Sequence, residues 1–356
     1  MSKNFGNDNK SAIQAKLDAQ KIAFAPIMFQ AARSLRDLGI LEYLLKNRRK
    51  GADIETIADD LNLSVYGVKV LLEAGLSLEV VQLKEGKYSI TKTGYFIVSD
   101  ELTKVNMDFT NDVNYLGMLS LMDSIKKGKP EGLKVFGKWN TIYEALAELP
   151  ENVRKSWFAF DHYYSDYAFP EVMPHLFADK PEKILDVGGN TGKFSMFCAN
   201  YDKDIHLTIL DLPGQIKEAK ENIKNNGFED RISTQALNLL DNSIPFPKAY
   251  DAIWMSQFLD CFSQEEISGL LKRAYNALDN NGSLYILETY WDKQEFEAST
   301  YSLHATSLYF TVIANGNSQM YHSNDMIKLV EASGLYIDKI IENIGVSHTL
   351  FKCRRK

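Results

Sequence analysis

The stretch Lys183–Gly192, KILDVGGNTG, decides the fold of this chain. Its first half is a short apolar run that predicts a buried β-strand, and its second half is a glycine-rich turn that leads into a predicted helix. Glycines let the backbone turn sharply and approach a ligand closely. Ligands of open α/β sheets bind at the carboxyl ends of the strands. We therefore expect a ligand-binding turn that contains Asp186, Gly188, Gly189, Asn190 and Gly192.

The next predicted strand, HLTILD, ends at Asp211, nineteen residues after Gly192. A carboxylate at that position can accept hydrogen bonds from both hydroxyls of a ribose, so the ligand is a dinucleotide or S-adenosylmethionine. The dinucleotide fingerprint GxGxxG is absent, because its last glycine falls on Lys193 or Phe194. The charge of Asp186 repels a diphosphate but suits an ammonium and a sulfonium. The turn therefore favours S-adenosylmethionine over NAD. The alternative is a turn whose glycines serve only the packing of strand against helix, and the acidic residues at two strand ends argue against it.

Strands and helices alternate after residue 183, which is typical of a parallel, doubly wound sheet. The further expected strands are 232–237, 251–256 and 283–288, and the expected helices are 214–226 and 264–278. The end of the chain breaks this alternation. Two strand-like runs, 335–344 and 346–353, flank Gly345 and predict an antiparallel hairpin at the edge of the sheet.

The first half of the chain has a different pattern. We expect a flexible arm over residues 1–20 that runs into a helix. Three further helices are expected, over 22–45 with a break near Gly39, over 54–62, and over 65–77 with Ser64 as N-cap. The run 80–97 predicts a β-hairpin that turns at Glu85-Gly86. Three helices and a hairpin form the winged-helix pattern, so we divide the chain into 1–20, a winged-helix domain 21–100, a helical region 101–180 and the α/β domain 181–356. Some of the aromatic residues within 157–169 are expected to line the ligand pocket.

Composition narrows the class of protein. The chain has 356 residues, 45% of them hydrophobic, and a formal net charge of -7, which makes nucleic acid a poor first candidate. The third helix of the winged pattern carries only one basic residue, Lys69, so a DNA-binding regulator is disfavoured. Three widely spaced cysteines form no CxxC pair, which predicts no metal site and free thiols in the cytoplasm. No leader segment and no membrane-spanning run of about 20 apolar residues are expected.

Three motifs resemble one family, the S-adenosylmethionine-dependent O-methyltransferases of the plant caffeic acid type and their bacterial small-molecule relatives. QLKEGKYSITKTG at 82–94 resembles the wing of that family, and ILDVGGNTG at 184–192 resembles its DVGGGTG turn, with Asn190 replacing the third glycine. LDLP at 210–213 matches its LDLP. The resemblance implies a Rossmann-like methyltransferase sheet whose last strand is antiparallel, a winged-helix dimerisation domain, a homodimer and a small-molecule substrate.

The resemblance also assigns residues to the site. Leu212 follows the ribose-binding acid, Asn238 and Leu239 align with the adenine-side motif, and Ser256 and Gln257 align near a basic position of the family. The general-base histidine of the family falls on Asp260, and the glutamate that steadies it falls on Gln319. His304 is the best substitute histidine, because its segment borders the substrate in the family. Capping of the helix that starts near Gln264 is the alternative role for Asp260, and Glu288 ends a strand near the site.

The expected activity is methyl transfer to a small aromatic or polyene acceptor, most often to oxygen. Most of the catalysis comes from holding nucleophile and methyl group in line, and a base adds about 10²–10⁴-fold. Methyl transfer therefore survives the loss of a histidine, and an already acidic acceptor needs no strong base. The alternatives are C-methylation, cofactor-assisted decarboxylation or hydroxylation, and a non-catalytic cofactor-binding protein.

Overall fold

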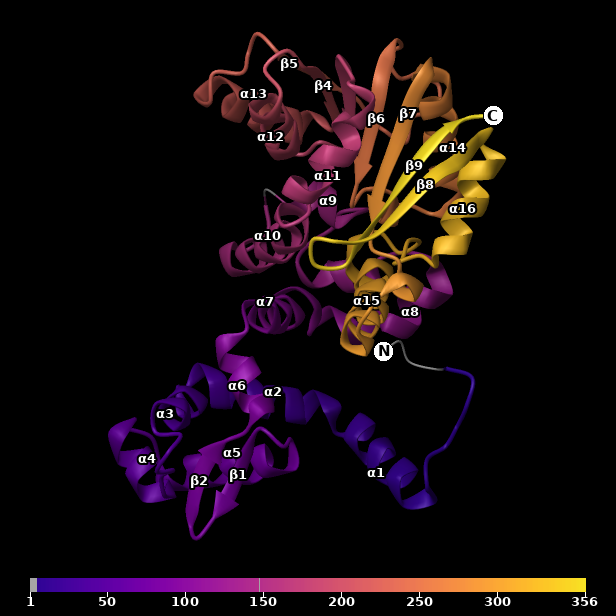
Figure 1. Cartoon of the computed structure of the whole chain (residues 1–356). Coiled ribbons are helices and arrows are strands. Elements are labelled where there is room, and N and C mark those ends of the chain that lie inside the picture. The colour runs from indigo at the N-terminus through magenta and orange to yellow at the C-terminus, as the bar shows by residue number, and fades with distance from the viewer. Residues whose placement is uncertain (1–4, 147) are drawn as a thin grey trace. The chain divides into compact units, whose positions relative to one another are not determined.

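The computed structural model describes residues 5–146 and 148–356 (Figure 1). The described chain separates into two compact units, of which the first ends at Asn111 and the second runs from Asp112 to Lys356. The helical region expected over 101–180 is therefore divided, and all of it beyond Asn111 packs in the same unit as the sheet. None of the helices in the described part of the chain combines the length and the apolar character needed to cross a bilayer.

The N-terminal unit is a bundle of short helices with one hairpin. Its elements are α1 (Ala12–Ala23), α2 (Ala25–Asp37), α3 (Ile40–Lys46), α4 (Ile54–Asp60), α5 (Val65–Ser77), β1 (Val81–Lys84), β2 (Lys87–Ile90), α6 (Lys92–Ser99) and α7 (Glu101–Phe109). Gly39, with a φ of 78°, separates α2 from α3. The side chain of Ser64 accepts a hydrogen bond from the Gly67 N–H at the start of α5. The break and the N-cap predicted from the sequence are confirmed.

One expectation for this unit is made more exact and another is wrong in part. The expected arm does run into a helix, which starts at Ala12 because Ser11 and Gln14 form a capping box there; the first four residues of the chain lie outside the described residues. The hairpin does turn at Glu85-Gly86, whose φ values of 51° and 77° fit a type I′ turn. Its second strand, however, ends at Ile90, since Thr91 caps α6 through the N–H of Gly94.

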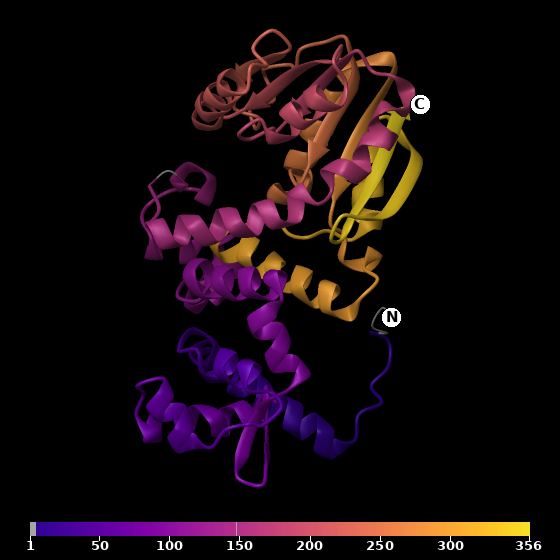
Figure 2. The same ribbon diagram turned by 60° about the vertical axis from the view of Figure 1, so that its left-hand side comes forward.

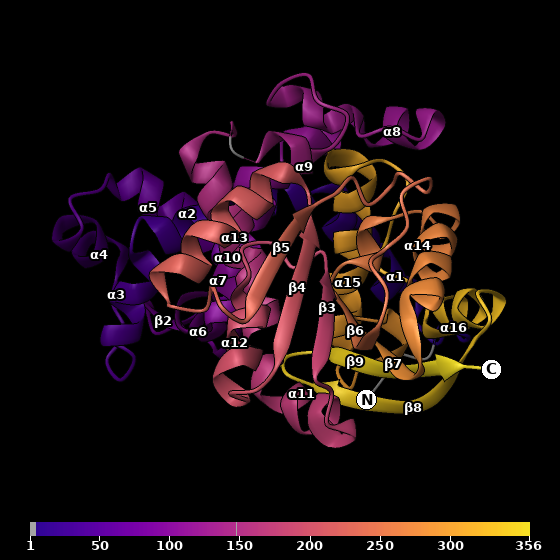
Figure 3. The ribbon, with the colours of Figure 1, turned by 90° about the horizontal axis from the view of Figure 1, so that it is seen from above.

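The C-terminal unit is built around a seven-stranded sheet, visible from above in Figure 3. Its strands are β3 (Lys183–Val187), β4 (His206–Asp211), β5 (Ile232–Ala236), β6 (Tyr250–Ser256), β7 (Leu278–Glu288), β8 (Leu335–Ile344) and β9 (His348–Arg355). They lie in the order β5-β4-β3-β6-β7-β9-β8. The ladders from β5 to β7 are parallel, whereas β9 is antiparallel to both of its neighbours. The predicted sheet with an antiparallel last strand is confirmed, and β9 inserts between β7 and the edge strand β8.

Helices cover both faces of the sheet, so alternate residues of the central strands enter two separate cores. Ile253 and Met255 of β6 belong to one core, which includes residues of α14 (Gln264–Ala277) and α16 (Ser323–Ala332). Trp254 belongs to the other core, where its ring stacks on Phe194 at 4.3 Å between ring centroids. This second core includes residues of α11 (Phe169–Leu176), α12 (Lys193–Tyr201) and α13 (Pro213–Asn225).

A helical layer lies beyond the carboxyl ends of the strands. In Figure 1 the arrowheads of β6 and β7 point toward α9 (Ile142–Ala145), α10 (Glu151–Asp166) and α15 (Glu297–Tyr309). α10 and α15 lie side by side, as Figure 2 shows, and the indole N–H of Trp157 donates to the Tyr309 hydroxyl at 2.7 Å. The layer also holds α8 (Leu121–Lys127) and single turns at Gly117–Ser120, Glu131–Val135 and Phe310–Ala314. Further single turns are Thr110–Asn114, which spans the boundary between the units, and Phe177–Asp179, Leu259–Cys261 and Trp291–Lys293.

Candidate active site

A cavity of about 480 Å³ opens where the strand ends meet the helical layer. One part of its wall comes from the sheet, through the turns that follow β3, β4, β5 and β6. The other part comes from α9, α10, α15 and the segment that follows α15. This second part is rich in aromatic side chains, which are Tyr143, Trp157, Phe160, Tyr164, Tyr309 and Phe310. The expectation that aromatic residues of 157–169 line the pocket is confirmed for Trp157, Phe160 and Tyr164.

The glycine turn leaves no room for side chains. A Cβ on Gly188, whose φ is 77°, would lie 2.3 Å from the ring of Phe258, and one on Gly189 would lie 2.7 Å from the carboxylate of Asp186. Gly192 has a φ of 83°, a conformation that strains any other residue. Gly188 and Asn190 line the cavity, whereas Gly189 and Gly192 support the turn from behind. The turn thus offers bare backbone to a ligand, as the sequence predicts.

Asp186 lies beneath this turn and does not line the cavity. Its Oδ2 accepts a hydrogen bond of 2.6 Å from the Ser195 hydroxyl. Burial raises the pKa of Asp186 to about 7, partly offset by that hydrogen bond. The structure places Asp186 as a support of the turn rather than as a wall of the cavity.

Asp211 faces the cavity at the end of β4. Its Oδ2 accepts a hydrogen bond of 2.8 Å from the backbone N–H of Asn190, and its Oδ1 accepts one of 2.7 Å from the N–H of Leu212. Burial raises the pKa of Asp211 to about 6, against the effect of these two donors. The carboxylate is therefore held in one orientation, with its remaining lone pairs available to a ligand's hydroxyls.

The other residues expected to bind the cofactor are only partly brought together. Asn238, Leu239 and Gln257 line the cavity, together with Leu212, but Ser256 does not. Gln257 adopts a φ of 45°, so the chain turns sharply where β6 ends. This turn directs Gln257 to the cavity and leaves Ser256 within the strand.

Asp260 lines the cavity from the single turn Leu259–Cys261, and it is 6% exposed. Its hydrogen-bond donor among the described residues is the Cys261 thiol, at 3.4 Å. Burial raises the pKa of Asp260 to about 7. The alternative role as a helix cap is wrong, because Ser263 caps α14 in a capping box with Glu266.

Glu288 holds the segment that carries Asp260. Its Oε1 accepts the backbone N–H groups of Phe258 at 3.0 Å and of Leu259 at 2.8 Å. Glu288 is 2% exposed, and within the described residues its Oε2 has no partner. Burial, and next the charge of Asp260, raise the pKa of Glu288 well above its usual range. Glu288 is therefore a positioning residue behind the cavity wall.

The structure places His304 and Gln319 outside the cavity. His304 is exposed on α15, where its ring packs against Trp291 at 5.0 Å between centroids. Gln319 is also exposed. The segment of Gln319 instead presents Asn315, Asn317 and Met320 to the cavity, and the side chain of Asn315 donates to the carbonyl of Cys261. The alignment of this segment with the family motif is loose, and it therefore assigned the site position to Gln319 rather than to a residue of the segment that lines the cavity.

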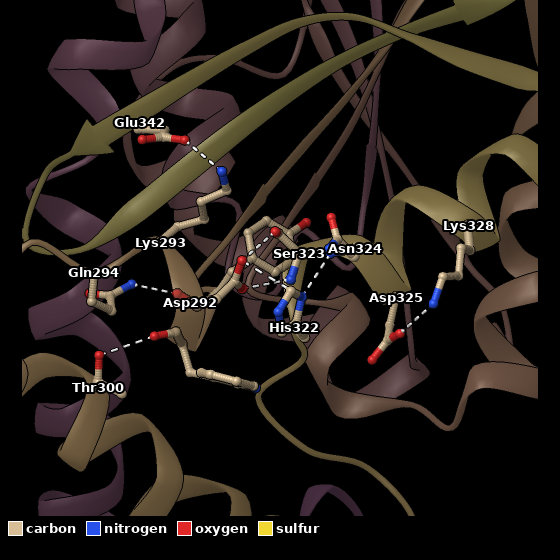
Figure 4. Close-up of polar contacts among 12 residues, drawn as sticks. Asp292, Lys293, Gln294, Thr300, His322, Ser323, Asn324, Asp325, Lys328 and Glu342 are labelled. Atoms are coloured by element: carbon tan, nitrogen blue, oxygen red, sulfur yellow. Dashed lines mark hydrogen bonds and ion pairs between the residues drawn. The ribbon is translucent and has the colours of Figure 1, made fainter. Parts of the chain in front are cut away.

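His322 has a structural role at the start of a helix near the site (Figure 4). The Nδ1 of His322 accepts the N–H of Asn324 at the start of α16. Beside it, Asp292 accepts hydrogen bonds from the N–H and the hydroxyl of Ser323, at 2.7 and 2.5 Å. His348 is fully buried, which lowers its pKa to about 4. The Asp292 contacts hold the loop that carries Met320, so these residues support the site indirectly.

One cavity residue was missed by the sequence motifs. Asp161 of α10 lines the cavity beside Trp157, Phe160 and Tyr164. The spacing 157, 160, 161, 164 puts all four side chains on one face of a helix. Asp161 could have been predicted from this spacing, because it is the one acidic residue among the three aromatic residues that share its face of the helix.

A sheet of this order, with a glycine turn after β3 and an acid at the end of β4, defines the Rossmann-like methyltransferases as the class of protein. The chain belongs to the family described as the O-methyltransferase domain, whose model matches residues 119–335, more than half of the chain. A second model, the Dimerisation2-like domain, matches residues 16–88. The resemblance to S-adenosylmethionine-dependent O-methyltransferases is confirmed.

Known proteins agree with this assignment. The chain is 25% identical to the L-tyrosine C(3)-methyltransferase of Streptomyces lavendulae over 78% of this chain and 76% of the relative. It is 26% identical to the acetylserotonin O-methyltransferase of Gallus gallus over 74% and 75% of the two chains. Among solved structures, the S-adenosylmethionine-dependent methyltransferase SibL has a TM-score of 0.72 at 21% identity, covering 94% of this chain and 98% of that one. At that identity the structural likeness shows the fold.

The protein is an S-adenosylmethionine-dependent methyltransferase, and the cavity fits this cofactor. Asp211 would present a fixed carboxylate to the ribose, and the bare turn at Gly188 and Asn190 would give the amino acid part of the cofactor a close approach. Asn238 and Leu239 would hold the adenine, and Gln257 lines the same cavity. No Lys, Arg or His lines the cavity within the described residues, so a dinucleotide diphosphate would meet no cationic side chain.

Proposed function

We propose that this enzyme methylates a small aromatic acceptor, most often on oxygen, inside the cavity between the strand ends and the layer of α10 and α15. The observation that carries the proposal is the division of the cavity wall. The cofactor residues Gly188 and Asp211 lie on the sheet side, and a set of aromatic side chains lies on the helical side. S-Adenosylmethionine, when bound, supplies an electrophilic methyl group. The chain then contributes mainly by holding acceptor and methyl group at short range, in line and away from water.

In this proposal Asp260 takes the position of the family's histidine as an orienting group. A pKa of about 7 is well below the value near 10 of a phenol, so Asp260 is a weak base toward a phenol. Its carboxylate can accept a hydrogen bond from the acceptor and fix the attacking atom. Glu288 keeps Asp260 in place through Phe258 and Leu259.

C-methylation is the second candidate. The relative from Streptomyces lavendulae matches over 78% of this chain and is named for methylation of L-tyrosine at C(3), a carbon atom. A phenol activated by hydrogen bonding is nucleophilic at oxygen and at the neighbouring ring carbons. Which atom reacts then depends on the orientation that the aromatic wall imposes on the ring.

The test is incubation with cofactor labelled in the methyl group and a panel of phenols. We expect S-adenosylhomocysteine to form with at least one phenol, and the chemical shift of the labelled methyl group in the product to distinguish O- from C-methylation. Asp211→Ala should abolish turnover at subsaturating cofactor, whereas Asp204→Ala, at an exposed position, should not. Binding of NAD, or cofactor binding without methyl transfer to any phenol, would contradict the proposal.

We also propose that the chain forms a homodimer through its N-terminal unit. α1 has a complete capping box but buries none of its residues. Ile13 and Leu17 on one face of α1 and Phe24 at its C-cap are 83%, 54% and 54% exposed, which indicates a face that a partner covers. The match to the Dimerisation2-like domain includes most of α1. Obligate interfaces commonly exceed about 2,000 Å².

Light scattering at micromolar concentration tests this assembly. We expect the mass of a dimer for the wild type and of a monomer for Ile13→Asp/Leu17→Asp. Ala15→Asp/Ala19→Asp is the matched control, because it adds the same charges to the opposite face of α1. A wild-type monomer, or a control that dissociates equally, would refute a dimer built on this face.

We further propose a cytoplasmic location. Cys198, Cys261 and Cys353 are all free thiols, and two of them are buried, which suits a reducing compartment. Fractionation of the source cells tests this, and recovery of the enzyme outside the cytoplasm would contradict it.

A further inference from the structure

The charges around the cavity all have one sign. Five carboxylates line it, those of Glu144, Asp161, Asp211, Asp260 and Glu266, and within the described residues no Lys, Arg or His does. In a cavity with apolar walls, charges are poorly screened. The cavity therefore attracts cations and repels anions.

Three of the five carboxylates are already engaged. Asp211 accepts two backbone N–H groups at the cofactor turn. Glu266 completes the capping box with Ser263 at 2.7 Å. Glu144 accepts the N–H of Asn140 at 3.2 Å and is exposed. This leaves Asp161 and Asp260 for a ligand.

Neither of these two carboxylates forms an ion pair within the described residues. Burial raises the pKa of Asp161, and the charges of His162 and Lys193 nearby only partly oppose that rise. Asp260 is 94% buried, and its side-chain donor among the described residues is the weak Cys261 thiol. Burial, and then the charge of Asp161, raise the pKa of Asp260, so the two groups lie close enough to interact. A buried carboxylate without a partner is costly, and a bound cation would remove that cost.

The walls beside them also suit a cation. Asp161 lies on the face of α10 that carries Trp157, Phe160 and Tyr164. Aromatic rings attract ammonium groups through their faces. Carboxylates set among aromatic rings form a site for an organic cation rather than for a metal ion, and no group of metal ligands is found within the described residues.

We propose that the acceptor carries a protonated amine, which binds to Asp161 and Asp260 while the aromatic ring packs against α10. This inference rests on the proposed methylation of a small aromatic compound and names its class: aralkylamines. It departs from the acidic acceptor expected from the sequence, because a carboxylic acid would meet two carboxylates and no compensating cation.

The experiment is calorimetry on protein saturated with S-adenosylhomocysteine. The probes are tyramine, L-tyrosine, 4-ethylphenol and 3-(4-hydroxyphenyl)propanoate, which share a phenol and differ in charge. A hydrogen bond to a charged group contributes about 1.5–3 kcal/mol, which is about ten- to a hundredfold in affinity. We expect tyramine to bind at least about tenfold tighter than 4-ethylphenol, and the propanoate to bind most weakly. L-Tyrosine should bind more weakly than tyramine, because its carboxylate meets the same acidic side chains, and tighter binding of L-tyrosine would count against the inference.

Three variants assign the effect. Asp161→Asn and Asp260→Asn should each remove most of the preference for tyramine over 4-ethylphenol. Glu151→Gln is the matched control, since Glu151 lies on the same helix, is exposed and does not line the cavity. Thermal melting checks that each variant folds, and removal of an unpaired carboxylate should not lower stability.

The outcomes separate this inference from the proposed function. Equal binding of tyramine and 4-ethylphenol to the wild type overturns the inference, and so does a preference that persists in both Asp161→Asn and Asp260→Asn. If Asp161→Asn instead weakens S-adenosylmethionine but not tyramine, the carboxylate serves the cofactor and the inference is wrong. Tyramine binding that depends on Asp161, without S-adenosylhomocysteine formation from any phenol, would refute methylation and leave the amine site standing.

Discussion

The backbone N–H of Asn190 donates a hydrogen bond of 2.8 Å to Oδ2 of Asp211. This bond joins the turn after β3 to the end of β4. It depends on the left-handed conformation of Asn190, whose φ is 48°. The third glycine of the family motif is therefore replaced by the residue that tolerates this conformation best after glycine.

The conformation of Asn190 gives the first prediction. Asn190→Gly should keep cofactor affinity within about threefold, because glycine adopts this φ freely. Asn190→Val should weaken the cofactor by about tenfold or more and lower the melting temperature, since left-handed backbone costs a non-glycine residue about 1–2 kcal/mol and a β-branched one more. Calorimetry and thermal melting measure both effects, and equal behaviour of the two variants would contradict the argument.

The second prediction concerns pH. The pKa of Asp211 is raised to about 6 by burial, so its carboxyl gains a proton as the pH falls through about 6. The protonated group loses its charge and part of its capacity to accept ribose hydroxyls. Affinity for S-adenosylmethionine should therefore be constant above about pH 7 and fall below pH 6. Asp211→Asn should bind more weakly and without this fall, and an unchanged pH profile in that variant would assign the titration to another group.

Glu288 gives a prediction about stability. Glu288→Ala leaves the N–H groups of Phe258 and Leu259 unpaired, at a cost of about 1–3 kcal/mol for each buried donor, and should also reduce turnover by displacing Asp260. Glu288→Gln keeps an oxygen acceptor for both. A glutamate ionises near pH 4.3 in the unfolded chain, whereas burial raises the pKa of Glu288 well above that value.

The sign of the pH effect follows from this difference. The contribution of Glu288 to stability is complete below about pH 4.3 and is lost as the pH rises toward its raised pKa in the folded protein. Glu288→Gln should therefore gain stability relative to the wild type as the pH rises from 5 to 8. Chemical unfolding at three pH values measures this, and a difference that is the same at every pH would show that Glu288 does not titrate.

The last prediction separates Asp260 from His304. Asp260→Asn should keep cofactor affinity and lose about ten- to a hundredfold in turnover, less than the upper range for a general base. His304→Ala should leave turnover within about twofold, because His304 is exposed and does not line the cavity. Loss of activity in His304→Ala together with full activity in Asp260→Asn would reverse these roles.

The sequence by itself determined the cofactor half of this protein. The turn Lys183–Gly192 and the motif Leu210–Pro213 could be predicted because each is a run of consecutive residues. A buried strand, a glycine turn and an acidic strand end depend on neighbouring residues alone. The alternation of strands and helices and the final hairpin about Gly345 are equally local, and all of them are confirmed. The sequence pattern was misleading for the second strand of the hairpin. Its residues favour a strand, but the side chain of Thr91 caps α6, and this one hydrogen bond ends the strand and begins a helix.

The acceptor half was decided by the tertiary structure. Its wall is assembled from α9, α10, α15 and the loop that carries Asn315, segments that are far apart in sequence, so no single motif describes it. His304 and Gln319 fell outside it because a shift of one residue in a helix turns a side chain by about 100°, and a loop has no fixed period at all. The position of Asp161 also depends on the tertiary structure. Its place around the axis of α10, and the packing of α10 over the strand ends, bring its side chain to the cavity and toward Asp260.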